Sequence, residues 1–581
     1  MSLSSRVQIH ISRSFLTLAL FALGLLIAWS LVVPIDEAPD EGEHWNYAVY
    51  LHVNRSLPAL DCSENIQPPL YYALVAPFAV PTQLPAPLWW FDDQAQLHLP
   101  STPRYFQNSN SDLVRYWPVR IARLLSAFLS ALAVVFIYWS GVEATGQDTT
   151  AVLAGSLAAF LPQFTFRGMN VSNESLLVLA CSIVTYCFVR MIRRGFSPRL
   201  GILTAIFIAL AFLSKNNALF LLGPFVLILV GMPGSRKERL KRLSLLLITL
   251  VILLPWLVRN QVLYGDPVAA TAIANRCLPI PTSGYVPKPI TDPWLYTVFP
   301  AMMGKSFVGM FGWMNVPLPG WIYAMFVILA GIATAGCAWG CLQNRIDRRF
   351  GLILTAVFAL NLLEAFVFNL TFSQAQGRFL FPSLPALALL AAFGIESLSR
   401  GSARITRILP VSLFLLNAFV LLAIVFPVYW PAPQEYLIAP DVNIPPKVPA
   451  GELATNMEFS QSFRSRCSGL SRVQLFLGVT DPTNTPPIFY RLIDSESKEM
   501  LYEKKITVSE IQDRAWSTFD FPPVTHSAGR EYLISLVSPD DRPGSAITVY
   551  RSQLDRYEEG TAFINGEAIP SDLAFRYFCS Y

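Results

Sequence analysis

Five carboxylates and one imidazole follow the first apolar segment of the chain within one short stretch. They are Asp36, Glu37, Asp40, Glu41, Glu43 and His44. Charges packed this densely beside an apolar segment are costly unless they are used. One interpretation is a capping box from Asp40 to Glu43, which starts an interfacial helix and leaves the other acids in water. The other is a general base that takes the proton of an attacking hydroxyl, with Asp40 as the first choice and Glu41 as the alternative.

Three cations stand at the ends of later apolar segments, and they are Lys215, Arg259 and Arg378. A guanidinium group can bind two phosphate oxygens at once, so these residues suit the phosphate group of a substrate. Each of them could instead be an anchor whose charged end reaches the membrane surface. One reaction that would use both the acidic stretch and these cations is glycosyl transfer with inversion. In this reaction a carboxylate deprotonates the acceptor hydroxyl, and nearby cations favour departure of a phosphate leaving group as an anion.

Most of the chain is too apolar for a soluble protein, because hydrophobic residues make up 53% and charged residues only 14%. Eleven apolar runs are candidates for helices that cross a bilayer. Their approximate bounds are 14–33, 118–140, 150–166, 174–191, 199–213, 217–232, 243–258, 320–341, 350–369, 379–398 and 408–429. The net charge of +4 is small, and no basic block alternates with aromatic residues, which argues against a nucleic-acid partner.

Lys and Arg gather in alternate loops, and this asymmetry predicts the orientation of the chain in the membrane. The clusters lie at 190–199, 236–242, 345–349 and 400–407, all on the side of the N-terminus. We therefore expect a cytoplasmic N-terminus and a first span that is retained rather than cleaved. The extracytoplasmic side then receives two long loops, 34–117 and 259–318, together with the acidic stretch and the three cations.

The tail, 431–581, differs in composition from the preceding part, 1–430. Its beginning is rich in proline, and alternating segments such as 473–477 are separated by Pro, Gly, Asn and Asp, which predicts an extracytoplasmic β-sandwich. A carbohydrate-binding sandwich and a passive cap both fit this pattern. The eight cysteines lack the spacing of a zinc or redox site. On an oxidising face two pairs could form or stay unpaired, and they are Cys62 with Cys277 and Cys467 with Cys579.

The acidic stretch, together with Gln67-Pro68-Pro69-Leu70-Tyr71-Tyr72 downstream, resembles the GT-C superfamily of membrane glycosyltransferases. This superfamily includes protein O-mannosyltransferases and the lipid A aminoarabinose transferase, and the chain is most similar to a bacterial branch of predicted membrane proteins. Further segments match in the same order along the chain: 120–126, 162–164 with 172–175, 255–267, 306–319 and Gln376-Gly377-Arg378-Phe379.

The resemblance implies a polytopic helical fold and transfer of a sugar from a polyprenyl-phosphate donor to an acceptor hydroxyl. The acceptor would be a cell-envelope glycan, a glycolipid or a protein at the outer face of a bacterial inner membrane. Glu174 stands where the superfamily usually has a second Asp, so its role stays open. His44 could orient Asp40 or bind a divalent ion with Glu41 and Glu174, and Tyr71 suits a sugar face. No cofactor is required by these motifs.

Two other functions remain open. A transporter or flippase for a lipid-linked saccharide would also place cations at the interface, but it predicts polar groups near the bilayer midplane and an internal repeat. A non-catalytic assembly subunit would use the tail to bind glycans and the membrane part as an anchor. This last function predicts that the acidic stretch is dispensable.

Overall fold

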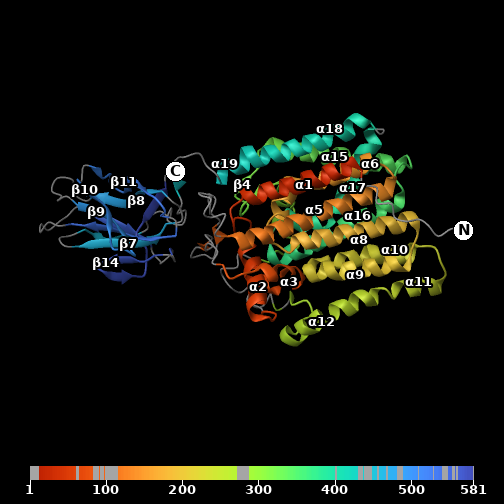
Figure 1. The fold of residues 1–581 in the computed structure, drawn as a ribbon, viewed down its shortest axis with the longest axis horizontal. Coiled ribbons are helices and arrows are strands. Elements are labelled where there is room, and N and C mark those ends of the chain that lie inside the picture. Colours follow the sequence, from red (N-terminus) through yellow and green to blue (C-terminus); the bar gives the residue numbers. More distant parts are fainter. Residues whose placement is uncertain are drawn as a thin grey trace. The chain divides into compact units, whose positions relative to one another are not determined.

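The computed structural model describes the greater part of both regions of the chain. The described residues are 12–59, 64–82, 90–91, 97–98, 116–270, 272, 287–399, 402–429, 436–437, 448–453, 457–465, 469–479, 488–507, 510–527, 529–538, 547–552, 557 and 560–579. They form two compact units, one helical and the other rich in β-strands (Figure 1).

Eight helical segments among the described residues are long and apolar enough to cross a membrane, which confirms a polytopic helical membrane protein. They contain α1 (Arg13–Val32), α5 (Trp117–Thr145), α8 (Glu174–Arg194), α11 (Arg236–Leu243) with α12 (Leu246–Tyr264), α15 (Gly320–Leu342), α16 (Arg348–Phe372), η6 (Gly377–Ser383) with α17 (Leu384–Ser399), and α18 (Ala403–Phe419) with η7 (Val420–Val425) and α19 (Phe426–Tyr429).

The other predicted spans are bent or short. The helices α6 (Asp148–Ala159) and α7 (Pro162–Gly168) form one apolar pair with a bend of 67°. The helices α9 (Pro198–Ser214) and α10 (Leu222–Gly231) are shorter, and η3 (Asn216–Leu221) joins them. Lys215 has an extended backbone between α9 and η3, so the predicted break at this polar stretch is confirmed. Each of the eleven predicted runs therefore falls on a helix.

Short elements lie between the spans. They are α2 (Glu41–Asn54), η1 (Glu64–Ile66), α3 (Leu70–Val75), η2 (Ala76–Phe78), η5 (Pro293–Leu295), α14 (Val298–Val308), and the strand pairs β1 (Trp90–Phe91) with β2 (Leu97–His98) and β3 (Met310–Phe311) with β4 (Val316–Pro317). In Figure 1, α2 and α3 lie at one end of the helical unit, and α11 lies at the other.

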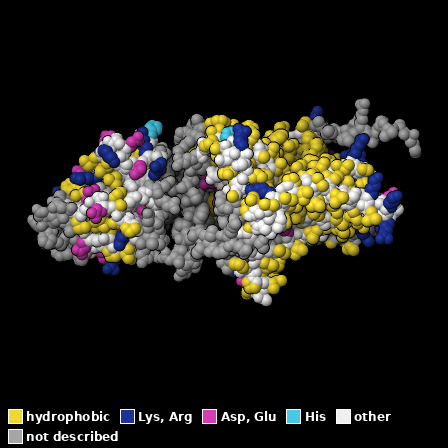
Figure 2. Space-filling view, turned by 90° about the horizontal axis from the view of Figure 1, so that it is seen from below, with side chains coloured by type: hydrophobic (Ala, Val, Ile, Leu, Met, Phe, Trp, Pro, Cys, Tyr) yellow, Lys and Arg dark blue, Asp and Glu magenta, His cyan; other side chains and the backbone are white. Residues whose placement is uncertain are grey.

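The surface of the helical unit is apolar along its sides. Exposed aliphatic side chains are frequent on α12 and α15, as expected of helices that face lipid. Lys and Arg side chains gather at the end of the unit that contains α11 (Figure 2). This distribution agrees with the alternating basic loops, while the assignment of that end to the cytoplasm stays a prediction.

The second unit is a β-sandwich of two antiparallel sheets, which confirms the predicted all-β fold. One sheet has the order β10-β9-β12-β7-β14-β15, and the other has the order β5-β16-β8-β13-β6 with β11 paired to β8. The strands are β5 (Tyr436–Leu437), β6 (Val448–Glu452), β7 (Glu458–Arg464), β8 (Leu470–Val479), β9 (Ile488–Asp494), β10 (Met500–Ile506), β11 (Ala515–Val524), β12 (Glu531–Val537), β13 (Ile547–Arg551), β14 (Ala562–Ile564), β15 (Glu567–Ile569) and β16 (Phe575–Cys579).

Alternation of buried and exposed residues along the strands explains this core. On β8, Val473, Leu475 and Leu477 point into the sandwich, while the residues between them are partly exposed. Cys579 on β16 forms a disulfide. The other cysteines of the two predicted pairs, which are Cys62, Cys277 and Cys467, lie outside the described residues.

Candidate active site

Asp40 stands at the start of α2, where its backbone adopts the left-handed conformation with φ at +68°. Aspartate tolerates this conformation better than most residues do, because its side chain is short and polar. Two hydrogen bonds hold the turn: His44 N donates to the Asp40 carbonyl at 3.0 Å, and Arg167 Nη1 donates to the Pro39 carbonyl at 3.0 Å. Within the described part of the chain, the Asp40 side chain makes no cap hydrogen bond to α2, so the capping-box interpretation is wrong.

Glu41 has a structural environment and does not fit the alternative role of base. Its carboxylate is fully buried and accepts two hydrogen bonds from Arg123, from Nε at 2.7 Å and from Nη2 at 2.6 Å. The backbone N–H groups of Asp36 and Val171 donate to the same carboxylate at 2.8 and 3.0 Å. Arg123 also binds carbonyl oxygens at the end of α1, which are those of Ser30, Val33 and Pro34. Glu41 therefore ties α1, α2 and α5 together.

Gly42 is required by the same turn. Its backbone N–H donates to Asp36 Oδ1 at 2.8 Å, and a Cβ atom at this position would lie 2.7 Å from that oxygen. This approach leaves no room for a side chain.

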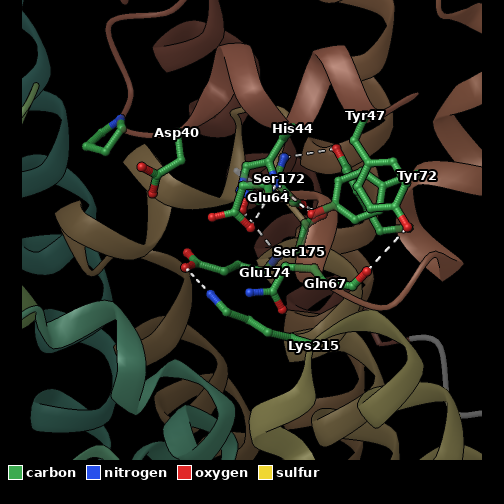
Figure 3. A network of polar contacts seen from close by, with 12 residues as sticks. Asp40, His44, Tyr47, Glu64, Gln67, Tyr72, Ser172, Glu174, Ser175 and Lys215 are labelled. Carbon is green, nitrogen blue, oxygen red and sulfur yellow. Dashed lines mark hydrogen bonds and ion pairs between the residues drawn. The ribbon is translucent and has the colours of Figure 1, made fainter. Parts of the chain in front are cut away.

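A cluster of opposite charges surrounds the side chain of Asp40, and we call it the charge cluster. Arg378 Nη2, at the start of η6, donates to Asp40 Oδ2 at 2.7 Å. Glu174, the first residue of α8, meets three cations: Arg167 Nε at 3.0 Å, Lys215 Nζ at 3.1 Å and Arg378 Nη1 at 3.6 Å. Figure 3 shows Glu174 and Lys215 in this arrangement beside Asp40. The cluster thus joins residues of α7, α8 and η6 with Asp40, which directly precedes α2, and Lys215, which directly follows α9.

The charge cluster carries more positive than negative charge and has unused donors. Three cations face the carboxylates of Asp40 and Glu174. Arg167 Nη2 and Arg378 Nε have no hydrogen-bond partner among the described residues, although both side chains are at least nine-tenths buried. The amides of Asn170 and Asn173, which are fully buried in the turn before α8, are likewise unpartnered there. Buried donors of this kind indicate a place for an anionic, hydrogen-bonding ligand.

A second group of polar side chains adjoins Asp40 on the side of α2. His44 Nδ1 lies 2.8 Å from the hydroxyl of Tyr72 and 3.7 Å from Glu64 Oε2 (Figure 3). The ring of Tyr72 stacks on that of Tyr47 with centroids 3.9 Å apart. His44 is buried, and burial lowers its pKa to about 3, so its imidazole is neutral at pH 7. His44 is thus placed to orient neighbours through hydrogen bonds rather than through charge.

The two carboxyls beside His44 differ in acidity. Burial raises the pKa of Asp40, but the positive charges of Arg378 and Arg167 outweigh this effect and hold the pKa below its ordinary value. Burial and the negative charge of Asp40 raise the pKa of Glu64 to about 7. Asp40 is therefore ionised at neutral pH, whereas Glu64 keeps its proton to a higher pH than Asp40 does.

The structure brings four predicted residues into the charge cluster or against it: Asp40, Glu174, Lys215 and Arg378, with His44 beside Asp40. Among the residues that the structure describes, no group of three or more His, Cys, Asp or Glu side chains could hold a metal ion. The set of His44, Glu41 and Glu174 is thus not assembled as a metal site.

Two predicted residues lie elsewhere. The hydroxyl of Tyr71 is buried against Ser126 Oγ at 2.7 Å and accepts a hydrogen bond from the backbone N–H of Ser172 at 3.0 Å. Arg259 Nη2, at the end of α12, donates to the Pro58 carbonyl at 2.6 Å, and its guanidinium lies over the Trp256 ring. Both contacts are structural, and neither side chain forms an ion pair with the charge cluster in the described residues.

Two residues of the site were missed by the sequence reasoning, which are Arg167 and Glu64. Arg167 directly follows the predicted run 150–166 on the side of Asp40, and the argument that selected Lys215 would have selected it as well. Glu64 had no such signal, because it lies in the middle of a long loop.

Comparison with known proteins identifies one segment of the chain. Residues 111–258 match the family model described as dolichyl-phosphate-mannose-protein mannosyltransferase. This match confirms, for that segment, the resemblance to the GT-C superfamily that the sequence motifs predicted. A search of the curated proteins finds no match.

Solved structures show only weak similarity to the chain. An oligosaccharyltransferase of Archaeoglobus fulgidus in the apo form is 13% identical with a TM-score of 0.41, and the match covers 71% of this chain and 55% of that one. ArnT from Cupriavidus metallidurans bound to undecaprenyl phosphate is 15% identical with a TM-score of 0.41, covering 71% and 64%. The Pmt1-Pmt2 protein O-mannosyltransferase complex of S. cerevisiae bound to the sugar donor is 18% identical with a TM-score of 0.31, covering 44% and 35%. The chain thus spans less than two thirds of each, and no statement on activity rests on these similarities.

Proposed function

We propose that the chain is an inverting glycosyltransferase that moves a sugar from a polyprenyl-phosphate donor to an acceptor hydroxyl at the extracytoplasmic face. The observation that carries this proposal is the charge cluster, in which an ionised carboxylate lies beside an excess of buried cations with unused donors. A base and an anion-binding group next to each other are what the reaction needs. The match of residues 111–258 to the mannosyltransferase family model supports the same reaction class.

The reaction can be assigned to named groups. The acceptor oxygen attacks the anomeric carbon of the donor from the face opposite the phosphate, so a new C–O bond forms as the bond to the phosphate oxygen breaks. Asp40 takes the proton of the acceptor hydroxyl. The bonding electron pair leaves with the polyprenyl phosphate, whose charge is stabilised by Arg378, Arg167 and Lys215.

Glu174 and His44 have supporting roles in this proposal. Glu174 contacts all three cations and holds their charged ends at one place. His44 links Tyr72 to the neighbourhood of Asp40 and Glu64. Both are positioning residues, because neither needs to touch the reacting atoms. The acceptor would be a glycan, a glycolipid or a protein, and the β-sandwich is a candidate carbohydrate-binding domain.

The test is transfer of radiolabel from a panel of polyprenyl-phosphate sugars by the purified full chain in lipid nanodiscs. We expect turnover with at least one donor, and loss of at least a hundredfold in rate in Asp40→Asn. Glu43→Gln is the matched control, because Glu43 lies one turn from Asp40 and forms no ion pair within the described chain. Burial and the charges of Asp40 and Glu64 raise the pKa of Glu43 to about 8, so the amide replaces a carboxyl that is mostly uncharged at pH 7. Turnover by Asp40→Asn at the wild-type rate would remove Asp40 from the mechanism. Binding of the carrier without turnover of any donor would favour the transporter instead.

A further inference from the structure

In the charge cluster, the proposed base, Asp40, forms an ion pair with Arg378, which is one of the residues proposed to bind the phosphate. We infer that Arg378 is held by Asp40 until the donor arrives, and that the donor phosphate then takes Arg378 from Asp40 and releases the base. This inference rests on the proposed function and adds an order to it. The acceptor hydroxyl can be deprotonated only in the complex with the donor.

The geometry of two arginines carries the argument. The Nε and Nη2 atoms of a guanidinium form one edge that can bind both oxygens of an anion. Arg123 uses this edge fully, since both atoms contact the carboxylate of Glu41. Arg378 uses only half of it, because Nη2 donates to Asp40 at 2.7 Å while Nε has no partner among the described residues. A phosphate that occupied the whole edge of Arg378 would have to displace Asp40.

The surroundings of Asp40 favour this exchange. Arg378 is 10% exposed and Asp40 is 24% exposed, so the carboxylate keeps access to water and an acceptor when the pair separates. The other charged or titratable groups that interact with Asp40 among the described residues are Arg167, His44, Glu43, Glu64 and Tyr72. Arg167 stays bound to Glu174 and to the Pro39 carbonyl, so the cluster keeps a cation near Asp40 after the exchange. The phosphate of the donor is a diester with one negative charge, like a carboxylate, and it competes for Arg378 through two free oxygens that can occupy both atoms of the guanidinium edge.

The consequence for the base is direct. A carboxylate that accepts a charge-assisted hydrogen bond from arginine is stabilised in its ionised form and is a weaker base. Once Arg378 binds the phosphate, Asp40 loses this bond and gains a nearby negative charge. Both changes strengthen it as a proton acceptor at the moment when the donor is in place.

The exchange predicts that Asp40 and the phosphate compete for Arg378. The experiment measures binding of a radiolabelled polyprenyl monophosphate to the full chain in nanodiscs, for the wild type, Asp40→Asn, Arg378→Gln and the double variant. We expect Asp40→Asn to bind the probe about tenfold more tightly than the wild type, which is about 1.4 kcal/mol. Glu43→Gln should bind like the wild type, because the raised pKa of Glu43 leaves its carboxyl mostly uncharged at pH 7, and the amide then removes little charge. In the Arg378→Gln background, Asp40→Asn should not increase the affinity for the probe, because the arginine for which Asp40 and the phosphate compete is then absent.

The outcomes separate the two proposals. Equal or weaker binding by Asp40→Asn would overturn the exchange, and so would a gain that persists with Arg378→Gln, since a general effect of charge would then explain it. If Arg378→Gln does not fold, Arg378→Lys replaces it, because lysine lacks the two-atom edge. If the wild type transfers sugar while the exchange fails, the proposed function still stands. If the wild type neither binds the probe nor transfers sugar, the proposed function itself is wrong.

Discussion

Two adjacent carboxylates, Asp40 and Glu41, should respond in opposite ways to the same change. Both are replaced by the isosteric amide, Asp40→Asn in one variant and Glu41→Gln in the other. Glu41 is fully buried and accepts four hydrogen bonds, two of them from Arg123. Asp40 is partly exposed, and Arg378 is its one ion-pair partner among the residues that the structure describes. We therefore expect a loss of stability from Glu41→Gln and a loss of activity from Asp40→Asn.

The size of the effect follows from the burial of the Arg123 and Glu41 pair. Removing one partner of a buried ion pair leaves the other charge uncompensated, which costs about 3–5 kcal/mol. An amide at position 41 also turns its N–H₂ group toward one of the donors that now face the carboxylate. One kcal/mol shifts the melting temperature by about 2–4 °C in a domain of 150–250 residues and by less in a larger one. We expect Glu41→Gln to melt about 4–8 °C below the wild type.

The assay is thermal unfolding of the detergent-solubilised chain, followed by intrinsic fluorescence and by loss of the monodisperse peak in size-exclusion chromatography. Asp40→Asn should melt closer to the wild type than Glu41→Gln does and elute with it, because Asp40 is 24% exposed and Arg378 keeps its contact with Glu174 at 3.6 Å. Transfer per folded molecule should remain in Glu41→Gln at low temperature. The reasoning would be refuted if Glu41→Gln melted with the wild type, or if it folded normally and lost transfer as completely as Asp40→Asn.

Three further changes test other parts of the helical unit. The pKa of Glu64 is raised from its ordinary value of 4.5 to about 7, so the folded state holds a proton that the unfolded state releases, and the stability this provides is lost as the pH rises from 5 to 8. The melting temperature of Glu64→Gln should therefore rise relative to that of the wild type over this pH range. A difference that stays constant with pH would contradict the raised pKa of Glu64. Arg259→Met should lower the melting temperature, because the contact with the Pro58 carbonyl is lost, but leave the KM for the donor within about twofold; a tenfold rise in KM would place Arg259 in the phosphate site. Gly42→Ala should cost about 1–3 kcal/mol of stability through its clash with Asp36, measured by the same melts, and unchanged melting would show that the turn can relax.

The helical architecture could be predicted from the sequence because apolar runs of sufficient length have few alternatives in a bilayer. The predicted break near Lys215 and the β-sandwich were also readable, since polar residues within an apolar run and alternation along a strand are local signals. The bend of 67° between α6 and α7 was not predicted. Proline at position 162 marks a helix start, but the direction that the chain takes there depends on packing against other helices.

The candidate site was only partly predictable. The sequence predicted that Asp40, Glu174, Lys215 and Arg378 lie on the same side of the membrane. It did not predict that their side chains contact one another. Arg259 satisfied the same criterion and lies elsewhere, because the order of helices around the bundle is a tertiary property. The different environments of Asp40 and Glu41 were equally hidden. They depend on where Arg123 points, and no spacing within the acidic stretch contains that information.

The ion pair between Asp40 and Arg378 joins positions that are 338 residues apart in the chain. During synthesis Asp40 and Glu41 emerge with the first loop, and Glu41 can form its ion pair as soon as α5, which contains Arg123, has been made. Arg378 arrives only with η6, after most spans have already been made. The scaffold around the acidic stretch can therefore form early, whereas the charge cluster is completed late. A ribosome-bound intermediate would have its carboxylates, Arg167 and Lys215 in place but not yet Arg378, so a half-built chain would lack one of the three cations that the proposed function assigns to the donor phosphate.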